Sequence, residues 1–195
     1  PTQSAFTVKV RGKASHAGFA PQDGVHAIRI AATAIAEMAI GRIGDDTTVN
    51  VGHIEGGRAS NIVPDYCEVS GELRSFSHKK ALEELAKVEQ IFAKEAEKCG
   101  GSIEFIRDIC YQAYKTDENE SVVKEFQKAC AACGIKSSLI ATFGGSDQNK
   151  MSEHGIPGIV MASAMHQVHS CQEYTEVSEM AQVAGIVSEL LQMKE

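Results

Sequence analysis

Residues 49–75 read VNVGHIEGGRASNIVPDYCEVSGELRS, and their pattern is the most informative part of the sequence about its fold. Apolar and polar side chains alternate at both of its ends, over residues 47–54 and again over residues 66–74. Alternation of this kind is typical of half-buried β-strands. Two adjacent glycines and a proline lie between them, in residues 55–65, and predict a loop. We therefore expect two consecutive strands joined by a loop.

A strand and a helix precede this stretch. Residues 5–10 alternate in the same way and predict a strand. Residues 24–40 carry apolar side chains at spacings of three and four, which predicts a helix, and Gly41 and Gly44 mark its end. Residues 12–23, between the strand and the helix, are polar and glycine-rich and predict a loop.

A second helix and a further strand follow the stretch. Ser77 is a suitable N-cap for an amphipathic helix that runs to Lys98, and residues 102–107 predict a strand. The resulting order, strand, helix, strand, strand, helix, strand, is that of the split βαβ or ferredoxin-like arrangement. We therefore expect the first part of the chain to be an α+β domain, ferredoxin-like βαββαβ.

The remaining residues predict a different architecture. We expect a helix that is capped by Asn119 and runs to Cys133. Two further helices are expected over residues 144–154 and 176–193, and two short apolar strands over residues 138–142 and 158–162. Such alternation is typical of a parallel α/β sheet covered by helices, but two strands alone make a marginal sheet. We therefore expect part of a parallel α/β domain, completed by another chain or by a front half that the first module interrupts.

The composition is that of an ordinary folded protein and excludes several classes. The 195 residues are 43% hydrophobic and 23% charged. A formal net charge of −7 and no basic run longer than Lys79-Lys80 argue against nucleic acid as a partner. The first residues given show neither the basic start nor the apolar run of a signal peptide, and no apolar run is long enough for a membrane span. Six cysteines without a signal favour reduced thiols in a cytoplasmic protein.

The loop over residues 165–174 holds the densest cluster of possible metal ligands, which are His166, His169, Cys171 and Glu173. It follows the second expected parallel strand, where α/β sheets place their ligands. Imidazole suits zinc, manganese or cobalt, and a catalytic zinc takes three protein ligands and water. No standard zinc spacing is present, so a solvated surface loop is the alternative.

Two glycines precede a helix in Gly144-Gly145-Ser146-Asp147. Glycines allow close backbone approach, and helix-terminal N–H groups attract a carboxylate or a developing oxyanion. The alternative is a tight turn in which Ser146 or Asp147 is a simple N-cap. The Lys-Ser/Thr ending of a phosphate-binding P-loop is missing.

Three polar residues of the first part suit substrate binding. Asn61 and Arg74 carry an amide and a guanidinium that can hold a carboxylate, and the loop residue His16 can donate to a developing negative charge. Each of them taken alone is more often a solvated loop or strand-end residue. Cys130 and Cys133 form a CxxC pair at a helix C-terminal end, where the dipole disfavours the thiolate, so helix packing explains them better than redox chemistry.

Four segments together resemble the zinc-dependent M20 peptidases, and within them the peptidase T-like tripeptide aminopeptidases. They are GKASHAGFAPQDGVHAI at 12–28, the stretch at 49–75, FGGSDQN at 143–149 and VHSCQEYTEV at 168–177. The resemblance covers essentially the whole chain. It implies a ferredoxin-like lid and dimerisation domain over residues 1–110, inserted into a catalytic α/β domain whose C-terminal part is residues 111–195.

The resemblance also implies roles for individual residues. His169 matches the last metal ligand, and His16 matches the lid histidine that reaches the partner subunit's active site and polarises the scissile carbonyl. Asn61 and Arg74 match lid residues that hold the substrate carboxylate. Residues 144–146 match a substrate-contacting loop opposite the metals.

The family's other metal ligands precede the lid and are not in this sequence. They are an HxD motif, a bridging Asp, a Glu pair that includes the general base, and a further acidic ligand. A site for two metal ions therefore cannot form from this polypeptide alone. We expect a C-terminal fragment of an enzyme that uses Zn²⁺, or Mn²⁺ or Co²⁺, to hydrolyse short peptides. The alternative is a homodimerisation and substrate-gripping module without activity of its own, and a weaker one is a thiol redox protein.

Overall fold

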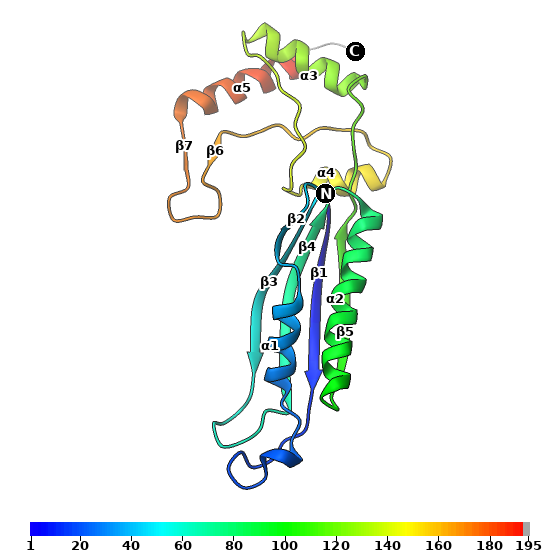
Figure 1. Cartoon of the computed structure of the whole chain (residues 1–195). Coiled ribbons are helices and arrows are strands. Elements are labelled where there is room, and N and C mark those ends of the chain that lie inside the picture. Colours follow the sequence, from blue (N-terminus) through cyan, green and yellow to red (C-terminus); the bar gives the residue numbers. More distant parts are fainter. Residues whose placement is uncertain (193–195) are drawn as a thin grey trace. The chain divides into compact units, whose positions relative to one another are not determined.

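The computed structural model describes residues 1–192. The chain divides into two compact units, Pro1–Tyr114 and Lys115–Glu195, each described here by itself (Figure 1). None of the helices in the described part of the chain has the length and apolar character that a membrane crossing needs.

The first unit is a five-stranded antiparallel sheet with two long helices. Its strands are arranged in the order β2-β3-β4-β1-β5. Along the chain the elements are β1 (Thr2–Arg11), α1 (Ala27–Glu37), β2 (Gly41–Ile43), β3 (Thr47–Gly56), β4 (Tyr66–Ser75), α2 (His78–Lys98) and β5 (Ser102–Tyr111), with a short 3₁₀ turn, η1 (Pro21–Asp23), before α1. The predicted ferredoxin-like order is confirmed, with β2 as an additional edge strand.

The first helix is shorter than the sequence predicts. α1 ends at Glu37, and the segment that follows forms β2, in which Gly41 pairs with Val49 of β3. Gly41 has a φ of +90°, a conformation that glycine adopts without steric cost, and this lets the chain turn from the helix into the edge strand. The glycine predicted to end the helix therefore begins a strand.

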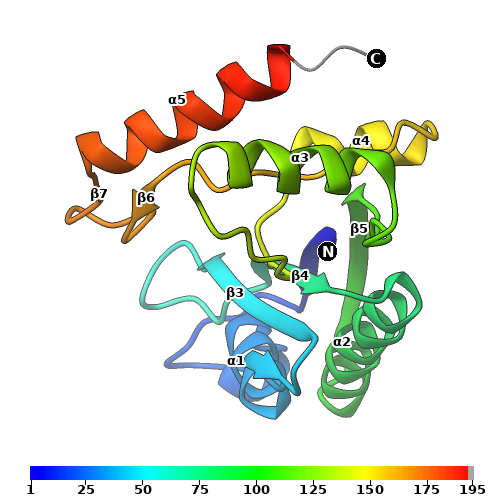
Figure 2. The ribbon, with the colours of Figure 1, turned by 90° about the horizontal axis from the view of Figure 1, so that it is seen from above.

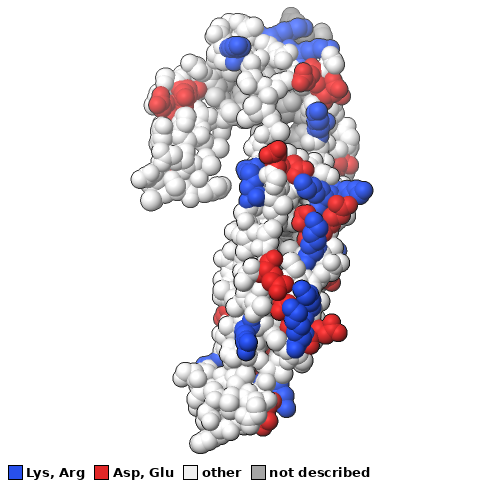
Figure 3. All heavy atoms as spheres, in the orientation of Figure 1, with Lys and Arg blue, Asp and Glu red and all other residues white. Residues whose placement is uncertain are grey.

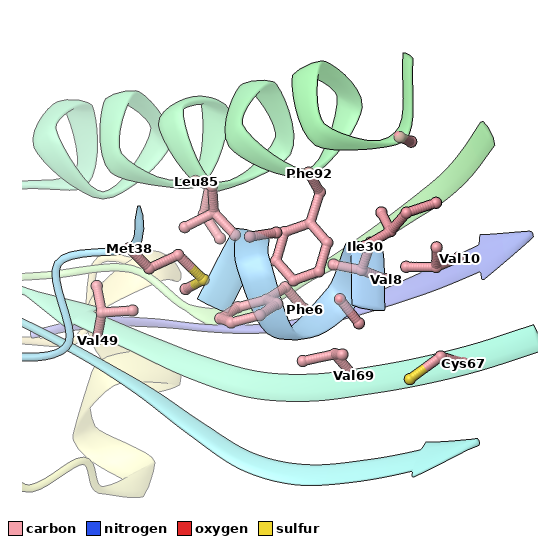
Figure 4. Close-up of a cluster of buried hydrophobic side chains, with 14 of the residues drawn as sticks. Phe6, Val8, Val10, Ile30, Met38, Val49, Cys67, Val69, Leu85 and Phe92 are labelled. Carbon is pink, nitrogen blue, oxygen red and sulfur yellow. The ribbon is translucent and has the colours of Figure 1, made fainter. Parts of the chain in front are cut away.

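Both helices cover the same face of the sheet (Figure 2). Alternate residues of β1 and β4 point into this layer, and Leu85 and Phe92 of α2 meet Phe6 and Val8 there (Figure 4). The helix surface away from the sheet carries charges of both signs, including the ion pair of Lys79 with Glu83 (Figure 3). The apolar side chains thus fill one continuous layer between helices and sheet.

The second unit contains three helices and one small ladder. Its elements are α3 (Ser121–Ala132), α4 (Asp147–Glu153), β6 (Met165–His166), β7 (Tyr174–Thr175) and α5 (Val177–Gln192). α3 packs against α5, and the buried side chains at this contact are Ala129, Cys130 and Ile186. The predicted end of the last helix at Met193 lies outside the described residues.

The two predicted parallel strands are not formed. Residues 138–142 and 158–162 make no strand ladder within residues 115–192, and Ile140 and Val160 are exposed. A strand requires hydrogen bonds from a neighbouring strand, and these two segments are not paired with each other. The only ladder among the described residues of this unit is the antiparallel β6–β7 pair.

The predicted cap of α3 is also wrong. Glu120 occupies the N-cap position, because Asn119 is engaged in a turn of its own. The backbone and side-chain N–H groups of Asn119 both donate to Oδ1 of Asp117, at 2.7 and 3.0 Å. These hydrogen bonds hold the pKa of the Asp117 carboxyl below its usual value.

Candidate functional site

His16 and Asn61 lie together at one tip of the first unit. The loop after β1 and the loop before β4 are joined by a bridge between His16 and Ile62. The backbone N–H of Ala17 donates to the carbonyl of Asn61 at 2.9 Å. Both His16 and Asn61 are exposed. The structure therefore places these two predicted residues side by side on the surface.

The turn around His16 determines which tautomer the neutral imidazole ring adopts. The backbone N–H groups of Gly18 and Phe19 both donate to Nδ1, at 3.1 Å each. The ring also packs against Phe19, with 4.3 Å between the ring centroids. Because Nδ1 accepts these hydrogen bonds, the neutral imidazole carries its proton on Nε2, as assigned from the heavy-atom geometry. His16 thus presents an N–H donor.

Arg74 lies at the opposite end of the same sheet. It is the penultimate residue of β4, opposite Gln3 of β1, whereas the loop of Asn61 precedes Tyr66 at the start of β4. A strand rises about 3.3 Å per residue, so Tyr66 and Arg74 are about 26 Å apart. An extended tripeptide spans only about 10 Å. Within one chain, Arg74 and the His16–Asn61 tip cannot contact the same short peptide.

Arg74 belongs to a hydrogen-bond network on the sheet face opposite the helices. Its Nε and Nη2 donate to the two carboxylate oxygens of Glu72, at 2.9 and 3.2 Å. These hydrogen bonds raise the pKa of the Arg74 guanidinium above its usual value. Gln3 donates to Glu72 at 2.9 Å, and Tyr111 donates to Gln3.

Three residues of this network are not predicted from the sequence, namely Glu72, Gln3 and Tyr111. A signal for Glu72 was present, because residues i and i+2 of a strand share a face and Glu72 is therefore beside Arg74. No signal was present for Gln3 or Tyr111, because they come from other strands and meet Arg74 only through the register of the sheet.

The glycine-containing loop before α4 forms a helix start. Ser146 is the N-cap residue, and its backbone N–H donates to Oδ1 of Asn149 at 3.2 Å. Asn149 is 1% exposed, whereas Gly144 and Gly145 are exposed. The N-cap alternative is thus realised for Ser146, and an anion-contacting role for the two glycines stays a prediction.

The loop of His169 has an unusual backbone. Ala164, Gln167 and His169 all have positive φ values, and that of His169 is 64°. The backbone N–H of His169 donates to Oε2 of Glu173 at 2.8 Å, which folds the loop back on itself. Left-handed conformations are costly for residues other than glycine and cluster at functional sites. The exposed imidazole of His169 can serve as one metal ligand.

Another candidate ligand of this loop, His166, contacts residues other than His169. Nε2 of His166 lies 2.6 Å from Oε2 of Glu179, and its ring stacks on Tyr174 with 4.8 Å between centroids. Within residues 1–192 no three His, Cys, Asp or Glu side chains gather in an arrangement that could hold a metal ion. The donors among the described residues therefore fit one ligand of a site and not a whole site.

Residues 3–99 match the M20 family peptidase dimerisation domain. The chain carries the dimerisation domain of the M20 peptidases. This match lies inside the unit Pro1–Tyr114. The assignment of residues 1–110 and 111–195 as lid and catalytic part stays a prediction.

Solved structures of relatives extend over both units. An aminopeptidase PepT from Bacillus cereus is 36% identical, with a TM-score of 0.83, and the match covers 98% of this chain and 52% of that protein. A tripeptidase from Staphylococcus aureus is 31% identical, with a TM-score of 0.91, and covers 98% and 51%. A Bacillus subtilis protein described as a dinuclear metal-binding M20 peptidase shares the fold at 17% identity, with a TM-score of 0.71, over 97% and 49%.

This chain spans about half the length of these relatives. One of them is named an aminopeptidase and another a tripeptidase, which agrees with the family resemblance of the sequence. The thiol redox alternative gains no support, because burial and the neighbouring Cys133 both raise the pKa of the Cys130 thiol. A thiol with a raised pKa is a poor nucleophile at neutral pH.

Proposed function

We propose that this chain supplies substrate-binding groups, one metal ligand and a dimer interface to a cytoplasmic, tripeptide aminopeptidase-like M20 peptidase. The observation that carries the proposal is the separation of the two predicted binding groups. His16 and Asn61 lie beyond the start of β4, and Arg74 lies near the other end of this strand, about 26 Å from Tyr66. A short peptide can contact both groups only if they come from two copies of the chain.

The enzyme is therefore a homodimer with shared sites. In each site, Arg74 and Asn61, from different copies, hold the substrate, with Arg74 paired to its carboxylate. Nε2–H of His16, from the same copy as Asn61, donates to the oxygen of the scissile carbonyl as negative charge develops there. The loop of Gly144, Gly145 and Ser146, in which both glycines are exposed, contacts the substrate.

His169 is the residue of this chain that would hold a metal ion. The donor chemistry fits Zn²⁺, and Mn²⁺ or Co²⁺ are alternatives. A bound pair of such ions would supply an activated water and polarise the carbonyl. The imidazole contributes one bond to this site, and the left-handed backbone at His169 directs the loop that presents it.

Complementation between two inactive variants tests the shared site. In the complete enzyme, His16→Ala should lower kcat and Arg74→Ala should raise KM for tripeptides, each by about 10- to 100-fold in kcat/KM. Mixing the two variants under conditions that exchange subunits should restore about a quarter of the wild-type activity, because random pairing leaves one intact site in each mixed dimer. If both variants are impaired and mixtures stay as inactive as their parents, the shared site is wrong.

The proposal that this chain holds only part of the catalytic groups is tested on the 195-residue chain itself. We expect no tripeptide hydrolysis after addition of Zn²⁺, Mn²⁺ or Co²⁺, because the described donors do not form a complete site. Sedimentation of the same sample should show a dimer. Substantial turnover by this chain would contradict the division of the catalytic groups proposed above.

A further inference from the structure

The side chain of Arg74 is held by a directional chain of hydrogen bonds across three strands. Tyr111 of β5 donates its hydroxyl hydrogen to the side-chain oxygen of Gln3 in β1, and the Gln3 amide donates to Oε2 of Glu72 in β4. Glu72 accepts from Arg74 with both oxygens. Each link uses a donor on one side and an acceptor on the other, so the orientation of the Gln3 amide is determined by its two partners.

The sheet register brings these residues together. Gln3 is opposite both Arg74 and Tyr111, and Glu72 shares the face of Arg74 because it precedes it by two residues. Arg74 and Glu72 are only partly exposed, with side-chain exposures of 27% and 39%. The network therefore rests on three neighbouring strands of a rigid sheet and not on a mobile loop.

The geometry of the Arg74–Glu72 pair determines how the guanidinium of Arg74 is oriented for binding a carboxylate. Glu72 engages the Nε–Nη2 edge of the guanidinium, which fixes the plane of the group. An arginine loses much side-chain freedom when it binds a carboxylate, and a guanidinium already held in one plane loses less. The pair as a whole is neutral, so its attraction for an anion depends on orientation and not on excess positive charge.

We propose that Glu72 is a positioning residue for Arg74, supported by Gln3 and Tyr111, and that it orients the guanidinium toward the C-terminal carboxylate of a short peptide. The inference rests on the role proposed for Arg74. Glu72 acts through Arg74 and does not contact the substrate. The competing effect of Glu72, repulsion of the substrate carboxylate, predicts the opposite sign for its removal.

Steady-state kinetics of the complete enzyme tests this inference with a tripeptide and the same tripeptide as its C-terminal amide. For Glu72→Gln, which keeps the shape of the side chain, we expect KM for the free acid to rise about tenfold with kcat within about twofold. KM for the amide should stay unchanged, because the amide has no carboxylate to orient. Tyr111→Phe should have a smaller effect in the same direction.

Glu89→Gln is the matched control. Glu89 forms an ion pair of the same kind with Arg107, at 2.9 Å, on the helix-covered side of the first unit. Its loss should change neither KM. A general loss of stability would affect the free acid and the amide alike, whereas loss of orientation affects only the free acid.

A second measurement does not depend on activity. In the 195-residue chain, the Nε–Hε group of Arg74 should give a rigid NMR signal that becomes mobile in Glu72→Gln and stays rigid in Glu89→Gln. An unchanged or lower KM for the free acid in Glu72→Gln, with Arg74→Ala impaired, would overturn the positioning role alone. An unimpaired Arg74→Ala would overturn the proposed function of Arg74 and this inference together.

Discussion

The two units of the chain differ in how completely each buries its own apolar side chains. In Pro1–Tyr114 the two helices and the sheet enclose a continuous buried layer that includes Phe6 and Phe92. Among the described residues of the second unit, the buried cluster consists of Ala129 and Cys130 of α3 and Ile186 of α5, with Ile135 and Met161 among the side chains packed against it, and Ile140 is exposed. All five strands of the first unit find their neighbours within Pro1–Tyr114, whereas residues 138–142 and 158–162 form no strand ladder among the described residues of the second unit.

The largest effect expected from this difference is on stability. Phe92→Ala removes a fully buried ring from the layer between α2 and the sheet. It should lower the free energy of unfolding of the first unit by about 3–5 kcal/mol. Ile186→Val in the second unit is a smaller change at a smaller core, and about 0.5–1.5 kcal/mol is expected. Chemical denaturation with a probe in each unit measures both values, and equal costs would contradict the comparison.

Substitution of a glycine in β4 provides a second test of the difference in packing between the two units. A Cβ on Gly71 would lie 2.2 Å from the carbonyl oxygen of Asn50 and 2.3 Å from the ring of Phe6. Gly71→Ala should therefore cost about 1–3 kcal/mol through overpacking. Gly144→Ala, whose new Cβ would come no closer than 3.4 Å to Thr142, is the control in the second unit. Thermal unfolding of the two variants distinguishes a tight site from an open one.

Much of the first unit could be predicted because its information is local. Alternation and caps identified β3, β4 and α2, and Ser77 is the N-cap of α2, where its hydroxyl accepts from Lys80. The edge strand β2 was missed, because three residues are too short for a periodic pattern. The strands of the second unit were predicted but not formed, because an apolar run shows that a segment can pair and does not show what it pairs with.

The candidate site shows the same limit. His16, Asn61 and Arg74 were identified from residue type and family resemblance, but their distribution over two ends of one sheet depends on the register of β1 and β4. The hydrogen-bond network around Arg74 depends on the same strand register. Which residues of different strands become neighbours is set by the folded sheet and cannot be predicted from the order of residues in the sequence.

Hydrogen exchange would show whether the second unit lacks its partners. Backbone amides of β1 and β4 should exchange slowly in the 195-residue chain, because they are paired in the interior of the sheet. Amides of residues 138–142 and 158–162 should exchange quickly there and slowly in the complete enzyme. Fast exchange of these segments in both samples would mean that no strand completes them.

Acid titration should produce the smallest effect. A hydrogen bond from Lys80 holds the pKa of the Asp46 carboxyl below its usual value. A carboxyl group whose pKa is lowered by folding stabilises the native state above its unfolded pKa, and this contribution is lost as the pH falls through the folded pKa. Asp46→Asn should therefore reduce the stability of the first unit at neutral pH slightly and flatten its decline below about pH 4. An unchanged acid profile would contradict this.

The left-handed backbone at His169 has a consequence for protein engineering. Glycine adopts a φ near +64° without the steric penalty that an L-amino acid pays, roughly 1 kcal/mol. His169→Gly should therefore be more stable than His169→Ala, and it can exceed the wild type in stability while it removes the imidazole. A thermostability screen without an activity assay would select this variant, and selection for stability alone would then discard the proposed metal ligand.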